Sequence, residues 1–147
     1  LIGRALISAE ITTMSLTIAM VHFHGLLRSE NPELGRDADT GGQVLYVLEV
    51  AKTLAEHKDV KQVILFTRLI QDSRLDKDYG IEMEPVKGCD NLLIVRQRAG
   101  PLEYIRKELL WPYVEEFADN ALTWSALGRD ASKRVAPDIT RVFSASL

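Results

Sequence analysis

The feature that most constrains the fold is an apolar run joined to an amphipathic run through two adjacent glycines. The first run, LTIAMVHF at 16–23, is nearly continuous in apolar residues, which is typical of a strand covered on both faces. Beyond the glycines, apolar residues follow the i, i+3, i+4, i+7 spacing of one helical face: Val44, Val47, Leu48, Ala51, Leu54 and Ala55. The pattern predicts a strand at 16–23 and a helix at about 43–57.

The glycine pair between these two elements predicts a ligand site. Thr40 and Gln43 have the spacing of a capping box, so we expect the helix to start at Thr40. Gly41 and Gly42 carry no Cβ, so a diphosphate or sugar hydroxyl could approach backbone N–H groups at the positive end of the helix dipole. The alternative is a tight turn and nothing more. The spacing is not the G-x-G-x-x-G pattern of dinucleotide-binding folds.

Two further apolar runs predict parallel strands at 60–67 and 91–96, the first reached through a helical crossover. The segment between them, 68–90, has little periodicity and is interpreted as a long surface connection. Arg68 and Arg74 are expected to be exposed there, the alternative being contact with a phosphate. A last helix is expected near 112–126, with Pro112 in its first turn. Its predicted inward stripe is Val114, Phe117, Ala118, Ala121 and Leu122.

These elements together predict an α/β fold with a Rossmann-like parallel sheet and helices in layers on both faces. Trp111 is expected to pack against the sheet at the start of the last helix, the alternative being stacking on a sugar. Lys107 lies in a connection that follows the third strand, where ligand crevices of such sheets are found. Taken alone, it is interpreted as a solvated lysine.

Composition excludes several classes of protein. The chain has 147 residues, the length of one domain, and its net charge of −3 gives no reason to expect nucleic acid or an anionic membrane as a partner. Arg4 and Glu10 interrupt the apolar residues near the N-terminus, so no secretory signal is predicted, and no run reaches the length of a membrane span. A single cysteine, Cys89, fits a reducing compartment, and we expect a cytoplasmic protein.

No metal site is predicted. His22 and His24 are two residues apart and so share one face of the first strand, but no Asp, Glu or Cys accompanies them at metal-ligand spacing. His57 follows the first helix and is interpreted as a solvated residue.

Three long segments resemble one family. HGLLRSENPELGRDADTGGQVLYVLEVAKTLAE at 24–56, VILFTRLIQDSRLDKDYG at 63–80 and LIVRQRAGPLEYIRKELLWPYVEEFADNAL at 93–122 resemble the N-terminal part of sucrose-phosphate synthase, a retaining glucosyltransferase related to sucrose synthase. The resemblance covers roughly residues 16–122. It implies a partial N-terminal domain of a two-domain GT-B glycosyltransferase, in which two Rossmann-like domains face each other across a cleft.

The resemblance also implies a reaction and a set of site residues. The family transfers glucose from UDP-glucose to fructose 6-phosphate and gives sucrose 6-phosphate. It has no tightly bound cofactor, although magnesium beside the nucleotide is compatible with it. By position, Gly41 and Gln43 of the GGQ motif and Lys107 of KELLWP contact substrates, with Gly42 beside them, and Lys107 meets the phosphate of the acceptor. No catalytic residue is assigned, because the domain that holds UDP-glucose is absent.

The two ends of the chain depart from the family. Residues 1–14 precede the first strand and are interpreted as a leader or read-through segment outside the fold, so that the truncated acceptor-side domain occupies 15–147. Residues 125–147 are atypical, although VAPDI at 135–139 has the composition of another strand. Three functions stay open: an enzyme segment that is inactive alone, a non-catalytic sugar-phosphate-binding or partner-binding module, and a sucrose-synthase-like chain that uses free fructose.

Overall fold

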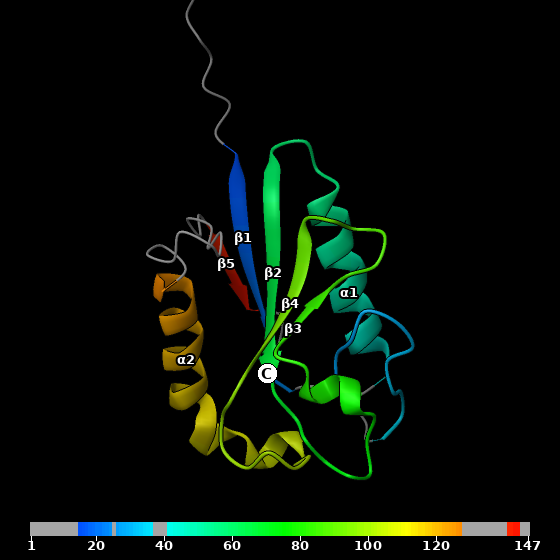
Figure 1. Cartoon of the computed structure of the whole chain (residues 1–147), viewed down its shortest axis with the longest axis vertical. Coiled ribbons are helices and arrows are strands. Elements are labelled where there is room, and N and C mark those ends of the chain that lie inside the picture. Colours follow the sequence, from blue (N-terminus) through cyan, green and yellow to red (C-terminus); the bar gives the residue numbers. More distant parts are fainter. Residues whose placement is uncertain (1–14, 25, 37–40, 128–140, 145–147) are drawn as a thin grey trace, which may run out of the picture.

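A five-stranded sheet with one long helix on each side forms the centre of the fold (Figure 1). The computed structural model describes residues 15–24, 26–36, 41–127 and 141–144. The sheet has the order β3-β4-β2-β1-β5. Its strands are β1 (Leu16–His22), β2 (Val60–Arg68), β3 (Met83–Pro85), β4 (Leu92–Gln97) and β5 (Arg141–Ser144).

Four of the five strands are parallel, as the helical crossover between β1 and β2 requires. β1 pairs with β2 from Leu16↔Val60 to His22↔Thr67, and β2 pairs with β4 from Val63↔Leu92 to Arg68↔Gln97. The three predicted strands and their parallel order are therefore confirmed. β5 pairs with the outer side of β1, also in parallel, and lies beyond the VAPDI segment, which falls outside the described residues.

The helix α1 (Gly42–Ala55) closes one face of the sheet. Five of its six predicted core residues are buried, and Leu54 packs against the same cluster while partly exposed. They meet alternate residues of the strands, because successive side chains of a strand point to opposite faces. The cluster beneath α1 contains Ile18, Met20, Leu27, Val44, Val47, Leu48, Ala51, Ala55, Val63, Leu65, Val86, Leu92 and Ile94.

The start of α1 differs from the prediction. The residue that caps the helix is Gly41, and no side-chain hydrogen bond caps it. The expected capping residue, Thr40, lies outside the described residues. The capping-box prediction therefore lies outside the described residues. Within them, the helix begins at the second glycine, with Gly41 as its cap.

The helix α2 (Val114–Leu127) covers the opposite face less completely. Its predicted existence is confirmed, but its predicted inward stripe is only partly right, because Leu122 is 67% exposed and Ala118 is also exposed. Phe117 is its buried residue, and Trp124 packs edge-on against Phe66, with 5.5 Å between ring centroids. The inward stripe is therefore Val114, Phe117, Ala121 and Trp124, at spacings of three and four residues.

The segment 68–90 is more ordered than its sequence predicts. It contains the 3-10 helix η1 (Lys77–Gly80) and β3, which pairs antiparallel with β4 from Met83↔Val95 to Pro85↔Leu93. Because β3 has only three residues, its sequence shows no alternation of apolar and polar side chains. Pro85 is tolerated there because β3 lies at the edge of the sheet. The long surface connection predicted for 68–90 therefore contains a short helix and an edge strand that the sequence did not predict.

Candidate functional site

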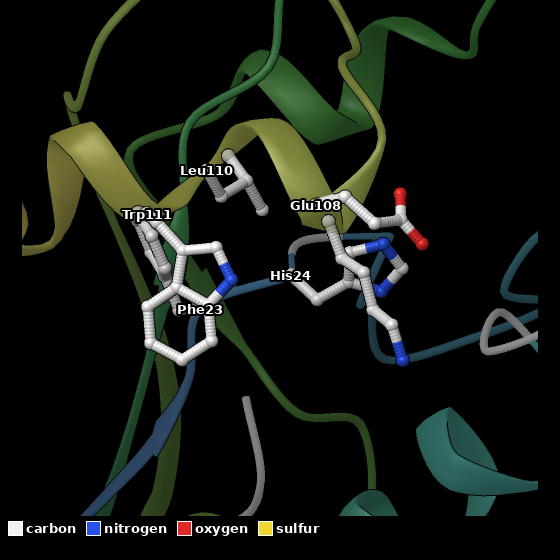
Figure 2. Close-up of a pocket in the computed structure, with 6 residues that line it drawn as sticks. Phe23, His24, Glu108, Leu110 and Trp111 are labelled. Carbon is white, nitrogen blue, oxygen red and sulfur yellow. The ribbon is translucent and has the colours of Figure 1, made fainter.

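A pocket of about 250 Å³ lies at the carboxyl end of β1, where Phe23 and His24 contribute to its wall. The first helical turn of α1 reaches the same end of the molecule (Figure 1). Ligands of open α/β sheets bind in crevices at the carboxyl ends of their strands, so the position fits a binding site. The pocket is lined by Phe23, His24, Lys107, Glu108, Leu110 and Trp111 (Figure 2).

Two short 3-10 helices present one wall of this pocket. They are η2 (Lys107–Leu109) and η3 (Trp111–Tyr113), which turn directly into α2. Leu110, between them, is 2% exposed and belongs to the core beneath α2, and its N–H donates to the Lys107 carbonyl at 3.0 Å. One buried leucine therefore anchors the turn from which its neighbours reach the pocket. Lys107 is half-buried rather than fully solvated.

Trp111 corrects an expectation. It is 62% exposed and lines the pocket, whereas its sequence position predicted packing against the sheet. Figure 2 shows its indole in front of Phe23, on the opposite side of the view from His24. Packing against the sheet at this corner is done by the neighbouring Leu110. A pocket lined by an exposed aromatic face and a cation can bind a sugar that carries a charged group.

His22 and His24 are buried at the end of β1 and beyond it, at 0% and 3% exposure. Their rings meet edge to face, with 6.5 Å between centroids, and His24 is also 6.5 Å from the ring of Tyr104. His24 contributes to the pocket wall. Within the described ranges, no group of three or more His, Cys, Asp and Glu residues is arranged to hold a metal ion.

The glycine pair is at the same end of the sheet but is not part of this pocket wall. Among the described residues that line the pocket, Lys107 is the one predicted site residue, and Gly41, Gly42 and Gln43 are not included. A Cβ on either glycine would meet no described atom within 4 Å. Packing within the described structure therefore gives no reason for glycine at these two positions, and the space beside the backbone is open.

The arginines that the sequence offered as phosphate ligands bind this chain instead. Arg68 was expected to be exposed in a loop, but it ends β2 with 0% exposure and donates to the carbonyls of Pro101 and Glu103. Burial lowers the pKa of Arg68 from its usual value. Arg74 pairs with Asp72, whose side chain is 3% exposed. Neither arginine lines the pocket.

Sequence reasoning selected Lys107, which lines the pocket, but not the other residues of the pocket wall. Phe23 and His24 lie just beyond the carboxyl end of β1, and a rule that ligand sites form at such ends would have selected them. Glu108 and Trp111 are neighbours of Lys107 in sequence, yet their orientation depends on the buried Leu110. The sequence pattern carried no signal for that orientation.

Comparison with known proteins gives the family. Residues 6–128 match the family model described as the sucrose synthase first GT-B domain. The chain belongs to this family. It is 44% identical over 120 residues to a probable sucrose-phosphate synthase 1 of Craterostigma plantagineum and 45% identical over 118 residues to sucrose-phosphate synthase 4 of Arabidopsis thaliana. These alignments cover 73% and 76% of this chain but 11% of each relative.

A solved structure confirms the fold. The sucrose-phosphate synthase of Thermosynechococcus elongatus superposes with a TM-score of 0.62 at 22% identity, over 88% of this chain and 27% of that one. The resemblance to sucrose-phosphate synthases and the assignment to a partial N-terminal GT-B domain are thus confirmed. No helix within the described residues is long and apolar enough to span a membrane.

Proposed function

We propose that this GT-B segment is the acceptor side of a glucosyltransferase that transfers glucose from UDP-glucose to fructose 6-phosphate and forms sucrose 6-phosphate in the cytoplasm. The observation that carries the proposal is the pocket that both Lys107 and the exposed Trp111 line. The ammonium group supplies a point charge for a phosphate, and the indole supplies an apolar face for the C–H bonds of a sugar. Glu108 adds a carboxylate that can accept from sugar hydroxyls.

The size of the pocket supports a site that this segment shares with a second domain. Its volume of about 250 Å³ lies below the roughly 300–1,000 Å³ of complete small-molecule sites. A second domain that closes over the carboxyl end of the sheet would complete it and bring UDP-glucose to the acceptor. We propose that Gly41, Gly42 and Gln43 contact the substrates in this closed arrangement, because their backbone presents N–H groups at a helix start.

The isolated chain should bind acceptor without transferring glucose. Holding donor and acceptor in the geometry of attack supplies roughly 7–11 kcal/mol of the barrier, and this contribution requires both domains. The purified 147-residue chain should therefore release no UDP from UDP-glucose and fructose 6-phosphate above a heat-denatured control. Turnover clearly above that control would contradict the proposal that the donor domain is essential.

Substitution of Lys107 tests the acceptor assignment. Calorimetric titration of the chain with fructose 6-phosphate should show binding about ten- to a hundredfold weaker in Lys107→Ala, since a contact to an ionised group contributes about 1.5–3 kcal/mol. Lys107→Arg should restore part of the affinity. Arg106→Ala is the matched control, because it removes an exposed cation from the adjacent position and should leave binding unchanged.

The same titration separates the alternatives. A chain that binds fructose as tightly as fructose 6-phosphate favours a sucrose-synthase-like acceptor and overturns the phosphate role of Lys107. A non-catalytic sugar-phosphate-binding module would also bind fructose 6-phosphate. For that alternative, the deciding measurement is glucose transfer by a polypeptide in which this segment is joined to a UDP-glucose domain.

A further inference from the structure

The segment 26–36 is irregular in structure, yet side chains from distant parts of the chain hold it. It lies between Phe23 and His24, which line the pocket, and the glycine pair that starts α1. In sequence, the segment thus connects the two parts of the proposed site. Leu26 and Leu27 are fully buried, which fixes its beginning, whereas residues from Glu30 onward are exposed or half-buried and need polar contacts to hold them.

Arg96 and Glu84 hold the first half of this segment. The Arg96 guanidinium donates to the carbonyl of Leu27 and to that of Ile81, both at 2.9 Å, and pairs with the Glu84 carboxylate. Glu84 in turn accepts from the backbone N–H of Ser29 at 2.8 Å. The Arg96 side chain is 0% exposed, so its hydrogen bonds form where water does not compete for them.

Tyr79 and Arg28 hold the second half. The Tyr79 hydroxyl accepts from the backbone N–H of Glu33 at 2.8 Å, and the Tyr79 side chain is fully buried. Arg28 stacks over the Tyr79 ring at 5.2 Å and donates twice to the Asn31 carbonyl, at 2.8 and 2.6 Å. Asn31 has a φ of 47°, a left-handed conformation that Asn adopts more easily than most residues. The turn is therefore supported from within and from η1.

We infer that Tyr79, Glu84 and Arg96 are positioning residues for the acceptor site, which they serve by fixing the 26–36 segment between the pocket wall and the glycine pair. The inference rests on the proposed function. None of the three residues lines the pocket of Lys107, so they act through the segment rather than by contact with a ligand. The connection between β2 and β4, which carries Tyr79 and Glu84, thus has a role beyond joining two strands.

Tyr79→Phe tests the inference, because it removes one hydroxyl and leaves the buried ring. Two quantities are measured on the 147-residue chain: hydrogen exchange of the Glu33 amide, followed by NMR, and the dissociation constant of fructose 6-phosphate. We expect faster exchange of the Glu33 amide by about tenfold and binding weakened about three- to tenfold, as expected for loss of one neutral hydrogen bond. Glu84→Gln should act in the same way on the Ser29 amide.

Two control variants separate positioning from general stability. Tyr46→Phe makes the same chemical change at a tyrosine that is 68% exposed on α1, and it should alter neither quantity. Ile64→Val removes one methylene group from the fully buried centre of β2 and lowers the thermal midpoint without touching the segment. At a matched loss of thermal midpoint, Ile64→Val should weaken fructose 6-phosphate binding less than Tyr79→Phe does.

Three results would overturn the inference: unchanged Glu33 exchange in Tyr79→Phe, faster exchange with unchanged affinity, or equal loss of affinity in Ile64→Val. Failure of the proposed function is distinguishable from these. It would be seen as a wild-type chain that does not bind fructose 6-phosphate, whereas exchange at Ser29 and Glu33 would still show whether the contacts hold the segment.

Discussion

The two faces of the sheet are closed to different degrees. Beneath α1, five helix residues are buried against Ile18, Met20 and their neighbours, and every predicted contact residue reaches the core. Beneath α2, Phe117 is buried while Val114, Ala121 and Trp124 are only partly so. Where a helix covers a face completely, as α1 does, apolar spacing predicts which residues are buried. Where the helix covers a face only partly, as α2 does, the same spacing also selects residues that stay exposed to solvent.

The largest expected difference in stability is between two leucine-to-alanine substitutions, one in the helix on each face. Leu48→Ala in α1 removes a side chain that is 3% exposed and should lower the free energy of unfolding by about 2–5 kcal/mol. Leu122→Ala in α2 removes one that is 67% exposed and should change it by less than about 0.5 kcal/mol. Urea unfolding followed by circular dichroism measures both. Equal losses would mean that Leu122 is buried in solution and would remove the contrast between the two faces.

A difference in stability is also expected between alanine variants at two glycines with positive φ. Gly100 (φ 65°) lies against the Tyr113 ring, where an added Cβ would come within 2.7 Å of ring atoms. Gly88 (φ 77°) has open space around it. Ala at either position meets the left-handed backbone cost of about 1–2 kcal/mol, and Gly100→Ala adds overpacking of about 1–3 kcal/mol.

Thermal unfolding of the two alanine variants should therefore give the lower midpoint for Gly100→Ala. Because Tyr113 belongs to η3, that variant should also weaken fructose 6-phosphate binding, and Gly88→Ala should not. A lower midpoint for Gly88→Ala would show that the corner at Gly100 relaxes without cost.

The smallest expected effect is on the pH dependence of stability, which arises from carboxylates and not from the two apolar cores. Hydrogen bonds from Arg74 hold the pKa of Asp72 below its usual range. Burial opposes ionisation of Glu84, but hydrogen bonds from Ser29 and Arg96 outweigh it and lower its pKa. A carboxylate whose pKa is lower in the folded state contributes stability above its unfolded pKa, near 4, and loses it as the pH falls through the folded value.

Acid should therefore destabilise the chain through these groups. The free energy of unfolding should decline as the pH falls below about 5, and it should decline less in Glu84→Gln than in the wild type. Asp119→Asn, at an exposed position of α2, serves as the control and should follow the wild type. Urea midpoints at pH 7, 4 and 3 measure the difference. A Glu84→Gln curve parallel to that of the wild type would contradict the stated role of this carboxylate.

The sequence by itself determined the central architecture. Continuous apolar runs placed every end of β1, β2 and β4 to within one residue, and helical spacing placed α1 and the buried Phe117. These features follow from periodicity, which is local and survives any arrangement of the rest of the chain. Lys107 was selected through a resemblance in its neighbouring motif, and the family is confirmed.

Tertiary structure decided what lies around that lysine. Trp111 faces the pocket because Leu110, and not Trp111, fills the core, and sequence alone gives no reason to choose between two adjacent apolar residues. Arg68 is buried because two backbone carbonyls more than thirty residues away accept its hydrogen bonds. Such contacts join residues distant in sequence, so no local pattern encodes them. They form only when the sheet has brought its carboxyl ends together.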